Sequence, residues 1–188
     1  MKRSRNVALV LLGAAAFGVA GCVEEKTEAA AFESKESCLA EASPGGWFSA
    51  ADCETAFAEA QVLHEETAPR YESRELCEQE HGVDACADQA SSGGGGGFFM
   101  PMLMGYMIGQ ALGGGGRVMS QPVVRSAGGG FATPDGSTKI GALNGGGQIR
   151  ASAFAKAPVT KGLAPMTKAQ VQSRGGFGSS AAARSAGG

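Results

Sequence analysis

The apolar side chains of residues 50–67 recur with the 3.6-residue period of a helix, and acidic side chains fill much of the opposite face. Ser49 and Asp52 stand where the two partners of a capping box belong, and Pro69 lies just past the expected end. The pattern therefore predicts an amphipathic helix that ends near Thr67. Its apolar stripe consists of Cys53, Ala56, Phe57, Ala60, Leu63, His64 and Thr67.

Two shorter helices are predicted on either side of this one. Ser34 and Ser73 have the composition of N-caps, and each is followed by a glutamate at the second helical position, where the helix dipole favours a negative charge. Gly82 follows as a C-cap. We expect one small core between these helices, with His64 packed at its edge. The side chains expected in it are Trp47, Phe48, Phe57, Leu63, Tyr71 and Leu76.

A second apolar run, Phe98–Leu112, lies between two stretches of glycine. Gly105, Gly109 and Gly113 recur every four residues and would share one helical face, which is the small-residue pattern of close helix contact. We therefore predict that residues 93–116 form an apolar helical segment rich in Met and Gly. It is too short to span a membrane comfortably. Three roles stay open: docking on the helices before it, lying against a membrane, or binding a partner helix.

The N-terminus combines three positive charges within residues 1–6 with an apolar run of fourteen residues, 7–20. That run would be about 21 Å long as a helix, short of the ~30 Å hydrocarbon core, so it is typical of an export signal. Its ending, Val19–Cys22, resembles the lipobox of bacterial lipoproteins. The resemblance implies removal of residues 1–21 and acylation of Cys22. The alternative is an ordinary signal cut nearby, with Cys22 unmodified.

Charge divides the rest of the chain into two halves. Residues 22–92 hold 17 acidic against 4 basic side chains, whereas residues 93–188 hold 1 acidic against 9 basic and 25 of the 31 glycines. We expect residues 22–31 to be an acidic linker and residues 117–188 to be a basic, largely disordered tail with a turn at Thr133–Gly136. The tail's scattered charges argue against a nucleic-acid partner, and its sign suits anionic envelope polymers.

Four cysteines follow Cys22, and an even number in an exported chain predicts disulfides. The frame Phe32–Cys38 returns as Tyr71–Cys77, which favours pairing within each copy, Cys38 with Cys53 and Cys77 with Cys86. The crossed pairing stays open. The two histidines stand at no zinc-ligand spacing and no catalytic motif is present, so we expect no metal, no cofactor and no catalytic residue. Residues 32–92 would form this cysteine module.

Several of these motifs, in this order, resemble the YgiB-like family of bacterial envelope proteins. They are the lipobox, the two cysteine pairs, Thr67–Tyr71, the run of residues 99–109 and Arg174–Gly178. The resemblance is clear over residues 20–115. It implies a link to biofilm formation and supplies no agreed enzymatic activity.

The expected fold is mainly α: a small disulfide-stapled helical module followed by a Gly-rich, largely disordered tail. The expected function is that of a non-enzymatic, lipid-anchored protein of the cell envelope. Because Val23 replaces the aspartate that retains enterobacterial lipoproteins in the inner membrane, the outer membrane is favoured. The alternative is an accessory subunit that docks on an envelope enzyme or efflux assembly through residues 98–113.

Overall fold

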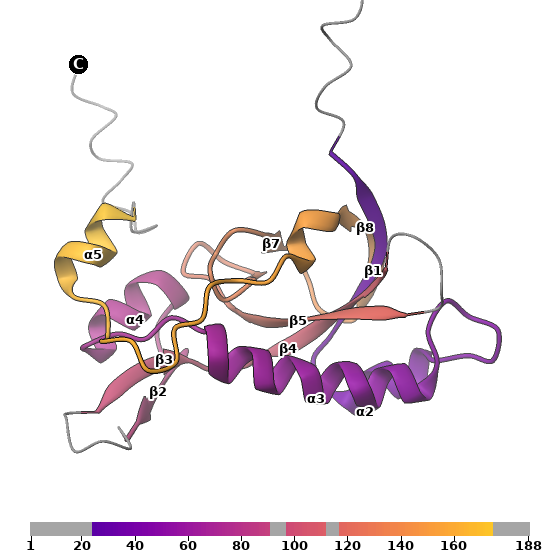
Figure 1. Ribbon diagram of the computed structural model, residues 1–188, viewed down its shortest axis with the longest axis horizontal. Coiled ribbons are helices and arrows are strands. Elements are labelled where there is room, and N and C mark those ends of the chain that lie inside the picture. Colours follow the sequence, from indigo (N-terminus) through magenta and orange to yellow (C-terminus); the bar gives the residue numbers. More distant parts are fainter. Residues whose placement is uncertain (1–23, 91–96, 112–116, 175–188) are drawn as a thin grey trace, which may run out of the picture.

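A curled antiparallel sheet forms the centre of the computed structural model, which describes residues 24–90, 97–111 and 117–174 (Figure 1). Six strands lie in the order β7-β6-β5-β4-β1-β8. Their bounds are β1 Lys26–Phe32, β4 Gly105–Gln110, β5 Val118–Arg125, β6 Phe131–Ala132, β7 Lys139–Ile140 and β8 Gly145–Arg150. The first strand therefore lies between two strands that come much later in the chain.

Helices α2 (Lys35–Glu41) and α3 (Ala50–Thr67) pack on one face of the sheet, and the short 3₁₀ helix η1 (Ala151–Phe154) packs on the other (Figure 1). A smaller unit sits at one end. It contains α4 (Arg74–His81), a hairpin of β2 (Cys86–Gln89) with β3 (Phe98–Pro101), and α5 (Lys168–Ser173). No helix in the described ranges is long and apolar enough to cross a membrane.

The three helices predicted in the cysteine region are confirmed, and so are their caps. The Ser34 hydroxyl accepts the amide of Ser37, and the Ser73 hydroxyl accepts the amide of Leu76. At the start of α3, Ser49 and Asp52 cap each other reciprocally. The residues that α3 buries are Cys53, Ala56, Ala60, His64 and Thr67, all members of the predicted stripe.

The expectation of a mainly α fold is wrong, first because the predicted helix of residues 93–116 is extended where it is described. Residues 98–101 form β3 and residues 105–110 form β4, with Gly105 and Gly109 in β4; Gly113 lies outside the described residues. Tyr106 and Ile108 pack toward α2 and α3, whereas Met107 packs toward the opposite face. A strand buried on both faces carries a continuous apolar run, which sequence alone does not separate from a helix.

The expectation of a disordered tail is also wrong over residues 117–174. These residues form β5 to β8, η1 and α5, and residues 175–188 lie outside the described part. Several of the few large apolar residues of this region are buried: Val123 and Ile140 lie beside Met107, whereas Val159 and Leu163 are exposed. The glycines of β8 pair with the alanines of β1, from Ala29↔Gly147 to Ala31↔Gly145. A segment with few large apolar side chains therefore folds because its strands join β1, from the first half of the chain, in one sheet.

Three apolar clusters replace the single small core that the sequence predicts. The first joins α2 and α3 to the sheet and includes Phe48, with Trp47 and Phe57 packed against it. The second fills the opposite face of the sheet. The third belongs to the smaller unit and includes Tyr71 and Leu76. Five of the six residues expected to pack together are thus divided between two separate cores, and Leu63 belongs to none of the three clusters.

Candidate functional site

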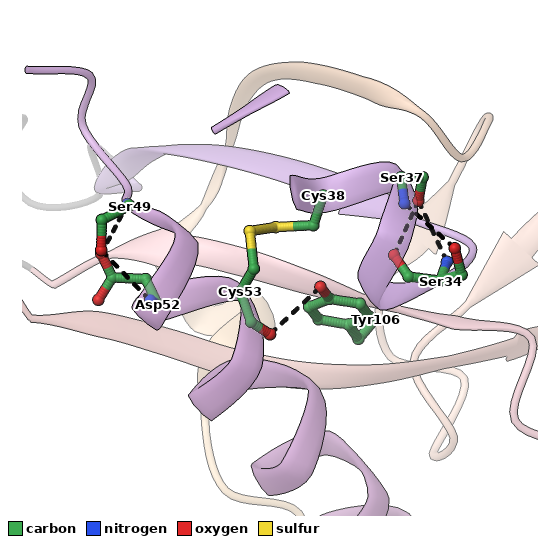
Figure 2. Close-up of a disulfide and its surroundings, with 7 residues drawn as sticks. All are labelled: Ser34, Ser37, Cys38, Ser49, Asp52, Cys53 and Tyr106. Carbon is green, nitrogen blue, oxygen red and sulfur yellow. Dashed lines mark hydrogen bonds between the residues drawn. A yellow bond between two sulfur atoms is a disulfide. The ribbon is translucent and has the colours of Figure 1, made fainter. Parts of the chain in front are cut away.

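Two disulfides are present, and each closes within one copy of the repeated frame. Cys38 is bonded to Cys53 and joins α2 to α3 (Figure 2); Cys77 is bonded to Cys86 and joins α4 to β2. The crossed alternative is therefore excluded. All four residues are buried, with at most 4% of any of them exposed. Each bridge belongs to a different apolar cluster, so each stabilises its own core.

The sequence repeat is also a structural repeat. In both copies a fully buried aromatic residue, Phe32 or Tyr71, stands two positions before the serine that caps the helix. The cysteine amide then donates to the carbonyl of that serine at 3.3 Å in each copy. In the first copy the hydroxyl of Tyr106, from β4, also donates to the Cys53 carbonyl at 3.4 Å (Figure 2). The repeated frame thus fixes an aromatic anchor, a cap and a bridging cysteine together.

The remaining predicted site residues are the lipidation site and the glycines expected to contact a partner helix. Cys22 lies outside the described residues. Gly105 and Gly109 do allow a close approach, but within the chain: a Cβ atom on Gly105 would overlap the carbonyl oxygen of Phe32, and one on Gly109 would overlap the ring of Phe154. These two glycines therefore allow tight packing inside the fold, and they do not present a face to a partner helix.

A pocket of about 310 Å³ opens where the smaller unit meets the sheet. The end of α4, the end of β5, the loop of residues 132–139 and Arg174 after α5 form its walls. This location was not predicted from the sequence. The polar and charged side chains that line it are Glu80, His81, Arg125, Ser126, Thr133, Asp135, Ser137, Lys139 and Arg174.

Beside the pocket a hydrogen-bonded chain links three segments of the protein: the residues before α4, α4 itself and β5. The buried Tyr71 hydroxyl donates to Glu80 Oε2 at 2.5 Å and lies 2.8 Å from His81 Nε2. On the other side of the ring, Nδ1–H of His81 donates to the carbonyl of Arg125 at 3.0 Å. Because a carbonyl can only accept, this contact fixes the proton on Nδ1.

The hydrogens of this cluster can be counted. With neutral His81, the one hydrogen of the Tyr71 hydroxyl can serve either Glu80 or Nε2, but not both. One further proton, on Nε2 or on the carboxyl, would satisfy every contact. Burial lowers the pKa of His81, and the charge of Arg174 lowers it too, while the Arg125 carbonyl and the charge of Glu80 raise it. Burial and the neighbouring Glu80 raise the pKa of Tyr71, so its hydroxyl stays protonated.

The loop on the opposite wall is held by its own side chains. Asp135 Oδ1 accepts hydrogen bonds from the Thr133 hydroxyl at 2.6 Å, the Ser137 amide at 3.2 Å and the Ser137 hydroxyl at 3.0 Å. Gly136, with a φ of 73°, completes the turn by donating to the Thr133 carbonyl. The predicted turn at Thr133–Gly136 is confirmed, and one oxygen of its carboxylate, Oδ1, accepts three internal hydrogen bonds.

Further hydrogen bonds join the two walls. The amide of Ala127 donates to the Glu80 carbonyl at 3.0 Å, and the Arg174 guanidinium donates to the Asp135 carbonyl at 3.3 Å. Together with the contact between His81 and Arg125, these bonds connect α4, β5, the loop and the end of α5 around the cavity. The pocket is therefore a fixed part of the fold.

Cationic side chains outnumber the carboxylates in the lining by three to two. Arg125, Lys139 and Arg174 are three of the nine lysines and arginines found from residue 93 onward. The two carboxylates in the lining already accept hydrogen bonds, Glu80 from Tyr71 and Asp135 from its own turn. Strand pairing brings Arg125 and Lys139 together, and the position of α5 adds Arg174. Within the described ranges, no group of three or more His, Cys, Asp or Glu side chains is placed to hold a metal ion.

A second buried histidine, His64 of α3, carries a prediction about pH. It is 9% exposed, and its Nδ1 atom has no hydrogen-bond partner among the described residues. Burial lowers its pKa to about 4, against a hydrogen bond to the backbone of Pro101 that raises it. Since its ordinary pKa is near 6.5, the unfolded chain binds a proton more readily between these values. Stability is therefore full above about pH 6.5 and falls as pH decreases toward 4, by about 3 kcal/mol from this group.

Urea unfolding at pH 7 and pH 4.5 tests this prediction on the wild type and on His64→Gln. The variant is expected to lose about 2 kcal/mol less than the wild type over that interval. His81 is present in both proteins, so its own contribution to the pH dependence cancels in the comparison. The same pH dependence in both proteins would show that His64 is not the group responsible.

The comparisons with known proteins place the chain in a family. A family model described as "Protein of unknown function (DUF1190)" matches residues 26–188. Two similar proteins, both called UPF0441 protein, come from Klebsiella pneumoniae subsp. pneumoniae and from Klebsiella pneumoniae strain 342. Each is 33% identical over 188 residues, covering 91% of this chain and 79% of the relative. No solved structure matches the chain.

The family description names no enzymatic activity. The matched region begins at the first residue of β1 and contains every helix and strand described above. From the extent of this match and the identity to the two relatives, the chain belongs to the DUF1190 family of proteins of unknown function.

Proposed function

We propose that the protein is a non-enzymatic lipoprotein of the bacterial cell envelope, anchored by acyl chains on Cys22 and folded in an oxidising compartment. The N-terminal charges, the short apolar run and the Val19–Cys22 ending support the anchor. Acylation by more than one chain gives firm membrane attachment, whereas a single chain binds only marginally. The resemblance to the YgiB-like family supports an association with biofilm formation.

The observation that carries this proposal is the burial of both disulfides. Each bridge lies inside an apolar cluster, and the exposed fraction of Cys38, Cys53 and Cys77 is zero. Disulfides used as core elements are typical of exported proteins, because the cytosol keeps thiols reduced. The position of Val23 after the lipidated cysteine favours the outer membrane, with the folded part in the periplasm.

Intact-mass analysis of the protein extracted from membranes tests the proposal. The expected chain begins at Cys22, carries acyl groups, and is lighter by four hydrogens than the form with four free thiols. Reduction and alkylation should then label four cysteines. In a Cys22→Ala control the acyl mass should vanish. A chain that still begins at Met1 and carries five free thiols would contradict the proposal.

The alternative role, an accessory subunit docking through residues 98–113, gains no support from this segment. Tyr106, Met107 and Ile108 are each at most 1% exposed, so β4 offers no apolar face to a partner. Replacing Gly109 by leucine would displace Phe154 and would therefore test folding and not docking. Within the described part of this segment, Met102 is exposed, so the alternative role would have to use that part and not β4.

A further inference from the structure

We propose that the pocket between α4, β5 and the loop of residues 132–139 binds a small ligand through an oxyanion, a carboxylate or a phosphate group, held by Arg125, Lys139 and Arg174. The proposal does not depend on the lipid anchor. It assigns a binding site to a surface for which neither the sequence motifs nor the family description gives a role.

The first argument is the balance of charge. Three cationic side chains meet at the cavity from three different segments against two carboxylates, which leaves a net positive charge, and those carboxylates already accept hydrogen bonds from Tyr71 and from the Thr133–Ser137 turn. Within the described ranges, Arg125 makes no ion pair and its side chain is exposed, so its guanidinium is available to a ligand. Arginine presents paired N–H donors that match the two oxygens of a carboxylate or a phosphate.

The second argument is preorganisation. The walls are joined by the hydrogen bonds from His81 to Arg125, from Ala127 to Glu80 and from Arg174 to Asp135. A ligand would therefore meet a site that is already formed, which reduces the entropy lost on binding. His81 and Thr133 lie in the lining with at most 5% exposed, so the cavity reaches buried polar groups and is more than a patch of surface lysines.

The third argument is size. A cavity of about 310 Å³ is at the lower end of the range for small-molecule sites, which run from about 300 to 1,000 Å³. It suits a molecule of about the size of one sugar ring or smaller. Ser126 and Ser137 add hydroxyl groups that can contact the uncharged part of such a ligand.

Isothermal titration calorimetry on the purified full-length protein, with both disulfides formed and in low-salt buffer free of phosphate, tests the assignment. The probes are glucose 6-phosphate, glucuronate and glucose, which share a ring and differ in charge. At least one anionic probe is expected to bind about tenfold more tightly than glucose. Binding of the phosphate ester alone or of the carboxylate alone would identify which oxyanion the site prefers.

Arg125→Met is the informative variant, because it removes the guanidinium but keeps the backbone carbonyl that His81 contacts. It should weaken binding of the anionic probe about tenfold, and Arg174→Met should do the same from the opposite wall. Lys156→Met removes one exposed cation of the same half that does not line the pocket, so affinity should not change. Thermal unfolding of each variant verifies that the fold is intact.

Three results would overturn the proposal. The first is the absence of binding by either anionic probe. The second is equal affinity for glucose and its charged counterparts, and the third is undiminished affinity in a folded Arg125→Met protein.

Discussion

Replacing Cys38 and Cys53 together by alanine is expected to lower the free energy of unfolding by about 3 kcal/mol or more. The bridge closes a chain separation of 15 residues, for which the loss of loop-closure entropy in the unfolded state alone amounts to about 3 kcal/mol. Both sulfur atoms also fill space inside the first apolar cluster, so their removal adds the cost of a cavity. Urea unfolding followed by circular dichroism measures the difference.

The second bridge provides the matched comparison. Cys77 and Cys86 are only nine residues apart, so the corresponding double alanine variant should lose slightly less, about 2.5 kcal/mol from loop closure. Adding a reductant should destabilise the wild type by breaking both bridges. In each variant it should break only the bridge that remains. A loss below about 1 kcal/mol for the Cys38/Cys53 variant would show that the first core does not depend on its disulfide.

Gly105→Ala is expected to destabilise the protein by about 3 kcal/mol or more. A methyl group at this position would meet the carbonyl oxygen of Phe32 and would lie 3.1 Å from the Cα atom of Glu33. Both are backbone atoms at the end of β1, so relief requires β1 and β4 to separate where they pair. Thermal and urea unfolding of the purified variant give the size of the loss.

Gly109→Ala, in the same strand, is the control for this prediction. Its methyl group would meet only the ring of Phe154, which can turn aside more easily than a strand backbone. We expect a smaller loss, of about 1–2 kcal/mol, and partial recovery when Phe154→Leu is added. Equal losses at the two glycines would mean that the backbone contact of Gly105 is no more restrictive than the ring contact.

The helices could be predicted because their signals are local. Ser34, Ser49 and Ser73 each cap a helix through hydrogen bonds that span three residues, and Pro69 follows the end of α3 directly. The disulfide pairing could be predicted for a related reason, since each bridge closes within its own copy of the repeated frame. Information of this kind lies within a short stretch of the chain, three residues for a cap and at most 15 for a disulfide.

The sheet could not be predicted because its information is spread along the chain. β1 pairs with β4 about eighty residues later and with β8 about one hundred and twenty residues later. Glycines four residues apart share a face in a strand as well as in a helix, so Gly105 and Gly109 suit both interpretations. The low apolar content of residues 117–174 indicates disorder only if that region has to supply a core by itself.

The pocket was missed for the same reason. The turn at Thr133–Gly136 and the arginine of Arg174–Gly178 were both visible in the sequence, but nothing showed that they meet. A hint lay in the repeated frame: Tyr71 replaces Phe32, so the second copy carries a hydroxyl group that the first lacks. That hydroxyl contacts Glu80 and His81 beside the cavity.

The early start of β1 has a consequence for geometry at the bilayer. This strand begins at Lys26, only four residues beyond Cys22, and even a fully extended chain advances at most about 3.6 Å per residue. If acyl chains hold Cys22, the start of β1 lies at most about 14 Å from the membrane surface, which is less than half the thickness of the hydrocarbon core. Lys26 is the register partner of Arg150 at that end of the sheet, and under this proposal the two cations would face the lipid headgroups. The folded domain would then lie directly on the membrane surface, with much less freedom of movement than a domain on a long flexible linker.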